Sequence, residues 1–239
     1  MIVGSTKEDL TLEKRVSLTP DSAKSIIGLG IKISIEKDYA AHIGIQDNEY
    51  KKVGVEIKNS SMDVLNTCDL LAKVNCPSDQ EIISLKDKTI LIGMLNPSKN
   101  KNKISGILKK KINIFSLELL PRITRAQSMD VLSSQSNLAG YRAVVDCVAE
   151  FEKAVPMMMT AAGTVPAAKV LVVGAGVAGL QAIATAKRLG AIVSATDVRA
   201  ASKEQVESLG GKFLTVDQSE NMETEGGYAK ETSEDYKKK

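Results

Sequence analysis

Residues 169–197 constrain the fold of this 239-residue chain more than any other stretch. A run of β-branched and apolar residues at 170–173 breaks off into a glycine-rich turn, GAGVAG, at 174–179. A helical pattern follows, Gly190 ends it, and a second apolar run covers 191–196. The order strand, turn, helix, strand predicts a βαβ unit whose glycines lie where the first strand meets the helix.

Each glycine of this turn has a mechanical role in such a unit. Gly174 permits the tight turn off the strand, Gly176 lets main chain approach an anion, and Gly179 lets helix and strand pack closely. The helix N-terminus then offers free N–H groups and the positive end of its dipole. Asp197 follows Gly179 by 18 positions, close to the roughly 20-residue offset of the acid that binds ribose hydroxyls. Glycine-rich strand ends also occur in plain α/β cores, but the agreement of all these elements favours a dinucleotide-binding site.

The first half of the chain predicts a parallel sheet of its own. We expect strands at five apolar runs of β type: 1–4, 31–35, 69–74, 89–95 and 112–116. Helical patterns lie between them, for example at 20–29. Such alternation is typical of βαβ units and of a mostly parallel sheet.

Past Asp197 the pattern continues for one helix, at 201–209, and one short strand, at 213–216. Residues 217–239 are charged and contain no buried-strand pattern. A dinucleotide fold has two βαβαβ halves, and these residues account for the first. We therefore predict an α/β protein with two doubly wound parallel-sheet domains, the second an incomplete Rossmann fold.

A polar segment separates the two predicted domains. Residues 121–136, PRITRAQSMDVLSSQS, are dense in hydrogen-bonding side chains and predict a loop. From 137 to about 155, apolar residues recur three or four apart, which predicts a long helix with one apolar face and Ser136 as its N-cap. We expect residues 1–136 to form the N-terminal α/β domain. Residues 137–239 then form a linker helix plus the first half of the dinucleotide-binding domain.

The charge and cysteine content exclude several classes of protein. The 32 basic and 29 acidic residues give a net charge of +3, which predicts no broad basic surface for nucleic acid or anionic lipid. The three cysteines lack CxxC spacing, which predicts reduced thiols in a cytosol-like compartment and no metal site. The N-terminus has no signal-peptide pattern, and the longest apolar window, 170–186, is shorter than the roughly 20 residues of a membrane span. Any work at a membrane would then depend on a partner.

Four stretches resemble a single family: VGSTKE…EKRVSLTP near the start, PRITRAQSMDVLSSQSNLAGYRAV, PAAKVLVVGAGVAGLQAIATAKRLGA and ATDVRAASKEQVESLGGKF. They are similar to the NAD-binding component, the alpha subunit, of proton-translocating NAD(P) transhydrogenase. The resemblance covers essentially the whole chain. Alanine dehydrogenases are related and share the architecture.

The resemblance implies that hydride passes between NAD(H) on this component and NADP(H) on a partner component. A membrane-spanning component couples this transfer to proton movement. It also implies a homodimer without nucleic-acid partners, located in the cytoplasm and held at the periphery of the inner membrane by its partner subunits. Members of the family continue through the second half of the dinucleotide fold, so we expect a separately encoded C-terminal portion.

The resemblance also implies roles for individual residues. Three residues of the polar segment would orient the nicotinamide and its ribose for catalysis: Arg122, Gln127 and Asp130. Ser133 would lie beside them at the cofactor. Four residues would line the adenosine end: Val177, Asp197, Val198 and Arg199. Gly227 and Tyr228 would belong to a mobile flap over the site.

Two other hypotheses remain open. Direct hydride transfer requires positioning and no side-chain acid or base, and the chain has a single histidine, His42. Alanine dehydrogenases resemble this chain at Arg15 and Lys73, which match their substrate-holding pair, but Asn96 stands where they carry a histidine. The second hypothesis is therefore an amino-acid oxidoreductase similar to alanine dehydrogenase. The third is a non-catalytic, truncated remnant.

Overall fold

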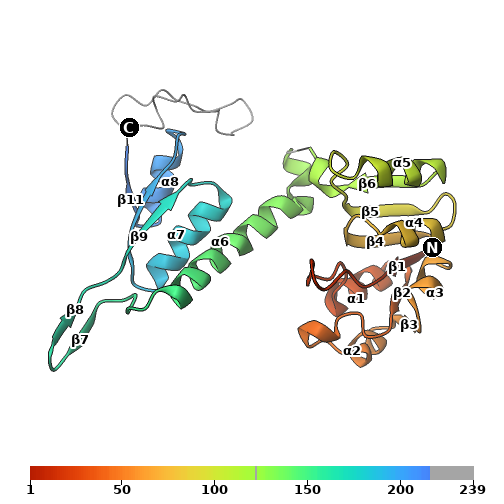
Figure 1. Cartoon of the computed structure of the whole chain (residues 1–239), viewed down its shortest axis with the longest axis horizontal. Helices are drawn as coiled ribbons and strands as arrows, with labels where there is room; N and C mark the ends of the chain where they lie inside the picture. Colours follow the sequence, from red (N-terminus) through yellow and green to blue (C-terminus); the bar gives the residue numbers. More distant parts are fainter. Residues whose placement is uncertain (122, 216–239) are drawn as a thin grey trace. The chain divides into compact units, whose positions relative to one another are not determined.

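The computed structural model describes residues 1–121 and 123–215, and the chain divides into two compact units (Figure 1). We call residues 1–130 unit 1 and residues 131–239 unit 2. The domain border that we predicted between residues 136 and 137 remains a prediction.

Unit 1 is built on a six-stranded parallel sheet with the order β3-β2-β1-β4-β5-β6. The strands are β1 (Ile2–Ser5), β2 (Lys32–Glu36), β3 (Glu56–Lys58), β4 (Leu70–Asn75), β5 (Ile90–Met94) and β6 (Asn113–Ser116). The five predicted strands are present, with ends shifted by one residue. Strand β3 was missed because it is short and Glu56 and Lys58 flank its single apolar residue. The order reverses direction at β1, as in doubly wound sheets, so the predicted fold class of this half is confirmed.

Short helices connect these strands: α1 (Pro20–Gly28), α2 (Asp47–Lys52), α3 (Ser61–Leu65), α4 (Asp79–Ser84) and α5 (Lys101–Lys109), with 3-10 turns η1 (Ala41–Ile43), η2 (Leu117–Leu119) and η3 (Thr124–Met129). The predicted helix at 20–29 is α1, which Thr19 caps and Pro20 begins. One apolar cluster packs around Ile35 and Tyr50, and another packs around Leu91. These two clusters are the core of unit 1.

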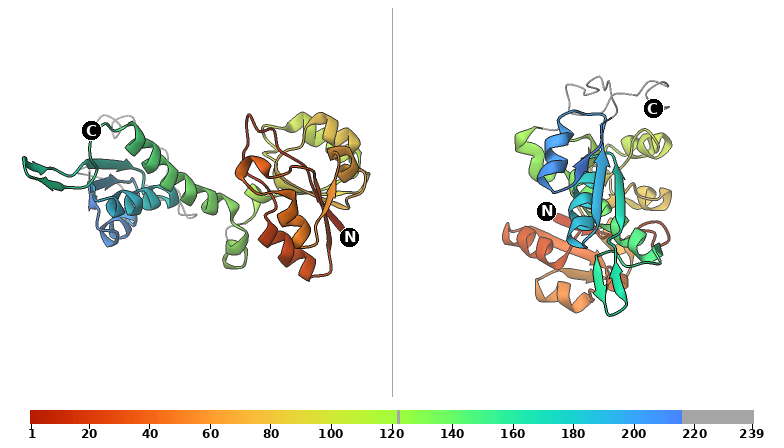
Figure 2. Two further views of the ribbon diagram at one scale, coloured as in Figure 1. Left: turned by 90° about the horizontal axis from the view of Figure 1, so that it is seen from below. Right: turned by 90° about the vertical axis from the view of Figure 1, so that its left-hand side faces the viewer.

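Unit 2 begins with the long helix α6 (Val131–Glu150), followed by the hairpin β7 (Met158–Thr160) and β8 (Gly163–Val165). The βαβ segment then follows as β9 (Lys169–Val173), α7 (Val177–Arg188), β10 (Ile192–Thr196), α8 (Ser202–Ser208) and β11 (Lys212–Phe213). Strands β9, β10 and β11 form a parallel sheet with the order β11-β10-β9. The hairpin extends away from this sheet (Figure 1, Figure 2).

Helix α6 differs from the sequence-based expectation. It begins at Val131, so Ser136 is an internal residue of the helix and not its N-cap, and it ends at Glu150. The segment predicted as a polar loop is therefore partly helical. Packing of α6 against α7 accounts for the difference: a side chain on Gly140 of α6 would overlap the main chain of Ala178. This tertiary contact outweighs the low helix propensity of the serines at the start of α6.

The sheet of unit 2 has the strand order of the first half of a dinucleotide fold, in which the first strand is central and the second and third lie to one side. Here β9 is the first strand, and the described chain places β10 beside it on one side only. The second domain is thus a Rossmann-like half-sheet, as predicted.

Candidate functional site

The turn from β9 into α7 leaves an uncapped helix N-terminus. Gly174 lies at φ +92°, a conformation that L side chains rarely adopt. Gly176 is the N-cap of α7, and no side chain caps this end of the helix. A Cβ built on Gly174 meets nothing within 4 Å. The first N–H groups of α7 therefore face an open space suited to an anionic group.

Gly179 lies where the first turn of α7 packs against the end of β9. A side chain at this position would overlap the carbonyl oxygen of Gly174. The strand and the helix therefore approach each other at a distance that only glycine allows.

Asp197, at the end of β10, is held by the glycine turn and by Arg199. Its Oδ2 accepts from the main-chain N–H of Ala175 at 2.7 Å. Its Oδ1 accepts from the main-chain N–H of Arg199 at 2.8 Å and from Nε of Arg199 at 2.9 Å, while Nη2 donates to Oδ2 at 2.9 Å. Burial alone would raise the pKa of Asp197, but the hydrogen bonds from Arg199 and Ala175 outweigh it and lower the pKa. The carboxylate is therefore ionised at neutral pH.

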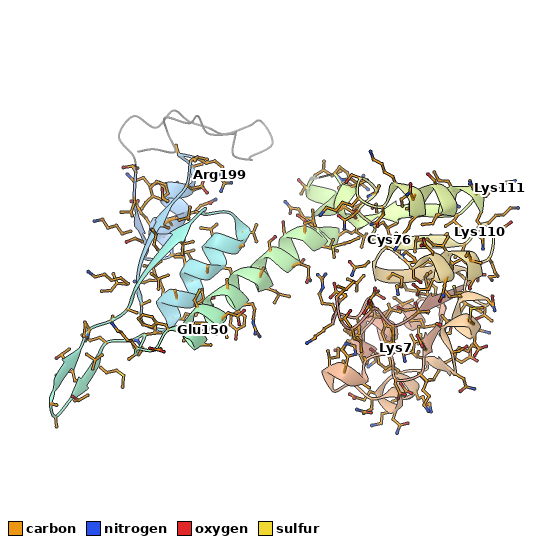
Figure 3. The ribbon with its side chains drawn as sticks, in the orientation of Figure 1. Lys7, Cys76, Lys110, Lys111, Glu150 and Arg199 are labelled. Atoms are coloured by element: carbon orange, nitrogen blue, oxygen red, sulfur yellow. The ribbon has the colours of Figure 1, made fainter. Side chains whose placement is uncertain are left out.

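These four hydrogen bonds fill the carboxylate of Asp197, because each oxygen has about two acceptor positions. Ribose hydroxyls would have to replace the side-chain donors of Arg199. The guanidinium lies near the glycine turn, since Nη2 is 3.9 Å from the place of a Cβ on Gly176 (Figure 3). A positive charge thus stands beside the helix end where we expect a pyrophosphate.

Sequence reasoning missed Ala175. This residue is fully buried between the glycines, and its N–H ties the turn directly to the carboxylate of Asp197. No side-chain chemistry marks it. Its place as the middle residue of a glycine turn was the one available signal.

The remaining predicted residues lie as follows. Val177 is the first residue of α7 and is 43% exposed, and Val198 is half-buried next to Asp197. In unit 1, Gln127 is exposed within η3, and Asp130 follows that turn and is half-buried. Ser133 is half-buried in α6 of unit 2. Three further residues, Arg122, Gly227 and Tyr228, lie outside the described residues.

Unit 1 has a polar pocket of about 540 Å³ around Lys73. The Lys73 ammonium, whose side chain is 3% exposed, donates to the Lys7 carbonyl (2.8 Å), Glu81 (3.1 Å) and Thr6 (3.2 Å), and it lies 3.6 Å from Glu8. Burial raises the pKa of Glu8. Burial would also raise the pKa of Glu81, but Lys73 and the Thr6 hydroxyl lower it. Lys73 is thus surrounded by oxygen atoms of its own chain.

Arg15 lies near the same pocket and is also paired. Its Nε and Nη2 donate to the two carboxylate oxygens of Glu13 at 2.8 and 2.6 Å. These hydrogen bonds from Arg15 lower the pKa of Glu13 to about 2. Both cations that match the substrate-holding pair of alanine dehydrogenases therefore already have carboxylate partners.

The half-sheet, the glycine turn and the acid at the end of β10 define an α/β protein of the dinucleotide-binding class. The chain belongs to the alanine dehydrogenase/PNT family. The sequence model of the family's N-terminal domain matches residues 4–139, and that of its C-terminal domain matches residues 143–233.

Individual relatives confirm the predicted resemblance. The first of the separately encoded portions of NAD(P) transhydrogenase subunit alpha from Rhodospirillum rubrum is 50% identical over 100% of this chain. A crystal structure of transhydrogenase from Sinorhizobium meliloti is 51% identical, covers 90% of this chain and superposes with a TM-score of 0.86. Alanine dehydrogenase of Methanococcus maripaludis is 28% identical over 90% of this chain. The chain spans 64% of the length of each of the first two and 58% of the third.

Within residues 1–121 and 123–215, every helix is too short or too polar to cross a lipid bilayer.

Gly179→Val should damage unit 2 more than Gln127→Ala damages unit 1. The valine would have to displace the Gly174 carbonyl, and overpacking of this kind costs roughly 1–3 kcal/mol. Gln127 is exposed, so its truncation should leave the melting temperature nearly unchanged. Thermal denaturation of both variants checks the prediction. Unfolding of Gln127→Ala beside a silent Gly179→Val would reverse the two roles.

Proposed function

We propose that this chain is the NAD(H)-binding component of a transhydrogenase that passes hydride between NAD(H) and NADP(H). The observation that carries the proposal is the uncapped glycine turn joined through Ala175 to an ionised Asp197. This geometry suits a pyrophosphate followed by a ribose with free hydroxyls. The similarity to transhydrogenase alpha subunits then favours this reaction over others that use the same cofactor.

The residues of unit 2 fit NAD(H) better than NADP(H). The charge on Asp197 would repel a 2′-phosphate, whereas ribose hydroxyls can donate to it. Gly174, Gly176 and Gly179 would hold the pyrophosphate against α7, and Val177, Val198 and Arg199 would line the adenosine. The cofactor supplies the hydride from its nicotinamide ring.

The proposed roles at the nicotinamide end are positional. Arg122, Gln127 and Asp130 would orient the nicotinamide and its ribose, with Ser133 beside them. Direct transfer between two nicotinamides requires near-contact geometry and exclusion of water, and no side chain has to exchange a proton with the substrate. Gln127 suits such a role because its exposed amide can both donate and accept.

The second candidate function, oxidation of a small amino acid, has less support. A substrate carboxylate would compete with Glu8 and Glu81 for Lys73 and with Glu13 for Arg15. Asn96, at the end of β5, contributes its main-chain N–H to Glu118 and offers no titrating group. The pocket lacks an evident acid or base among its described residues that is free of such pairing.

We further propose three kinds of partner. A component that binds NADP(H) would receive or supply the hydride, and a membrane-spanning component would couple the transfer to proton translocation and hold this chain at the cytoplasmic face of the inner membrane. A second copy of the chain would form a homodimer. A separately encoded C-terminal portion would complete unit 2.

A reconstituted reaction tests the proposed function. The chain is mixed with the NADP-binding component of the Rhodospirillum rubrum enzyme and with the portion of its alpha subunit that lies outside the match to this chain. We expect NADPH to reduce an NAD analogue of distinct absorbance, and we expect no NADH from L-alanine and NAD⁺. Alanine-dependent NADH formation would support the second candidate instead. Robust turnover without the added alpha-subunit portion would show that this portion is dispensable.

A further inference from the structure

Strand β9 is the edge of the sheet in the described part of unit 2. It pairs with β10 through five residues in parallel register, from Lys169–Ile192 to Val173–Thr196. Its other edge pairs with no described strand. Two large apolar side chains on this strand remain exposed, Leu171 at 60% and Val173 at 78%. An unpaired, apolar edge is a template for another strand.

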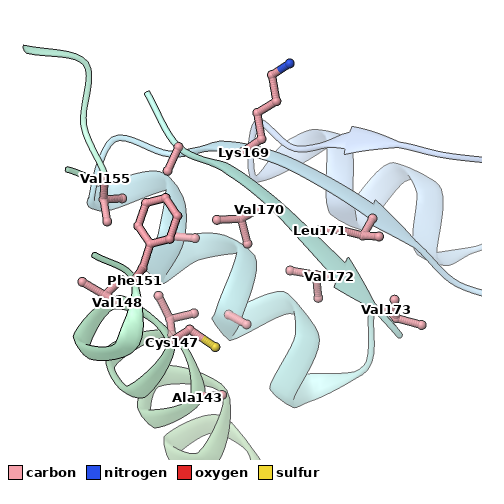
Figure 4. A pocket seen from close by; sticks show the side chains of 14 residues that line it. Ala143, Cys147, Val148, Phe151, Val155, Lys169, Val170, Leu171, Val172 and Val173 are labelled. Atoms are coloured by element: carbon pink, nitrogen blue, oxygen red, sulfur yellow. The ribbon is translucent and has the colours of Figure 1, made fainter. Parts of the chain in front are cut away.

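An apolar groove of about 400 Å³ runs along this edge (Figure 4). Helix α6 forms one wall with Cys147 and Val148, Phe151 follows the end of this helix, and β9 forms the other wall with Val170 and Val172. Charged side chains are almost absent from the lining, since Lys169 at the start of β9 is the one charged residue among its 14 members. Contiguous apolar surfaces of this kind mark sites of contact with another polypeptide.

The groove has the shape that an added parallel strand requires. The main chain of β9 would pair with the new strand, and the apolar row on α6 would cover one face of it. The opposite face of β9, which carries Leu171 and Val173, would be covered by a helix that follows the new strand.

The strand order identifies the occupant. In the order 3-2-1-4-5-6 the fourth strand lies directly beside the first, and β9 is the first strand here. The relatives are longer than this chain, which spans 64% of the Rhodospirillum rubrum subunit. We propose that the groove between α6 and β9 docks a separate polypeptide that adds a parallel strand beside β9. This inference rests on the partner portion of the proposed function, and it does not depend on hydride transfer.

Cys147 provides a built-in probe because it lines the groove and is exposed. The reference thiol is Cys76, which is partly exposed in the polar pocket of unit 1. Cys68 is buried, and burial raises its pKa to about 11, so it serves as the unreactive limit. The probe polypeptide is the portion of the Rhodospirillum rubrum subunit outside its match to this chain.

The experiment measures the rate at which N-ethylmaleimide labels each cysteine of the full chain, with and without the probe polypeptide. We expect the probe to slow labelling of Cys147 by roughly tenfold or more, because a covered thiol reacts only after local opening. The rate at Cys76 should not change. Equal labelling of Cys147 in both samples would overturn the proposal. No nucleotide is needed, so failure here is distinguishable from failure of the hydride-transfer assay.

Two further outcomes would also overturn it. If Cys147 in the chain alone is as slow as Cys68, and independent of concentration, another segment of this chain already covers the groove. If its rate falls as the chain concentration rises, a second copy occupies the groove.

A matched pair of variants locates the contact. Leu171→Lys should weaken binding of the probe polypeptide by roughly tenfold or more, because a lysine would enter an apolar interface and protect the edge. Leu108→Lys, on α5 of unit 1, changes a leucine of almost equal exposure, 59% against 60%, and should leave binding unchanged. Calorimetric titration checks both, and melting temperatures verify that each variant folds. Equal binding by both variants would place the contact elsewhere and overturn the proposal.

Discussion

Asp197→Ala is expected to weaken NADH binding about 10- to 150-fold, since hydrogen bonds to a charged group contribute on the order of 1.5–3 kcal/mol. The variant should also lose its preference for NADH over NADPH, because the charge that repels a 2′-phosphate is gone. Fluorescence titration with both nucleotides measures the two effects. The ratio of the two dissociation constants is the stronger readout, since a general loss of stability would leave it unchanged.

The matched control is Asp146→Ala, which removes an exposed acid of unit 2 that pairs with Arg142 at 2.7 Å. This variant should bind NADH as the wild type does. Below neutral pH the preference for NADH should persist until Asp197 is protonated, and its lowered pKa places that loss below the usual range of an aspartate. Equal or tighter binding of NADPH by the wild-type chain would refute the assignment of Asp197.

Lys73→Met is expected to destabilise unit 1 by about 3–5 kcal/mol, because it leaves buried carboxylates without their cation. The side chains of Glu8 and Glu81 are 8% and 17% exposed, so water cannot replace the lysine. Chemical denaturation of wild type and variant near neutral pH measures the difference. The control Lys58→Met breaks a pair at the surface, with Glu56 63% exposed, and should cost about 0–1 kcal/mol.

The pH dependence of this difference has a definite sign. The folded-state pKa of Glu81 lies below its unfolded value, so its pairing stabilises the wild type above the unfolded pKa and is lost as pH falls through the folded pKa. In the variant, protonation of Glu8 and Glu81 relieves the unpaired charge. The gap between the two proteins should therefore narrow below about pH 5. A small effect at neutral pH, within about 1 kcal/mol, would mean that Lys73 is not a structural partner of these acids.

Local patterns in the sequence were sufficient for the fold class and for the frame of the candidate site. Apolar runs of β type located five strands of unit 1 to within one residue. The spacing of glycines located the turn between β9 and α7, where Gly174 takes a positive φ. These features are readable because each depends on residues close together in the chain, whose backbone preferences act independently of the rest of the fold.

Pairings between distant residues were decided by the tertiary structure alone. The bond from Ala175 to Asp197 joins two strand ends, the use of Lys73 by Glu8 crosses from one strand end to another segment, and α6 begins at Val131 because it packs on α7. Nothing in the local pattern distinguishes a lysine that binds a substrate from one that neutralises its own chain. Sequence by itself determined which backbone segments form and where they turn. The three-dimensional packing determined which charges meet, because the free energy of a buried ion depends on the partners that other segments bring to it.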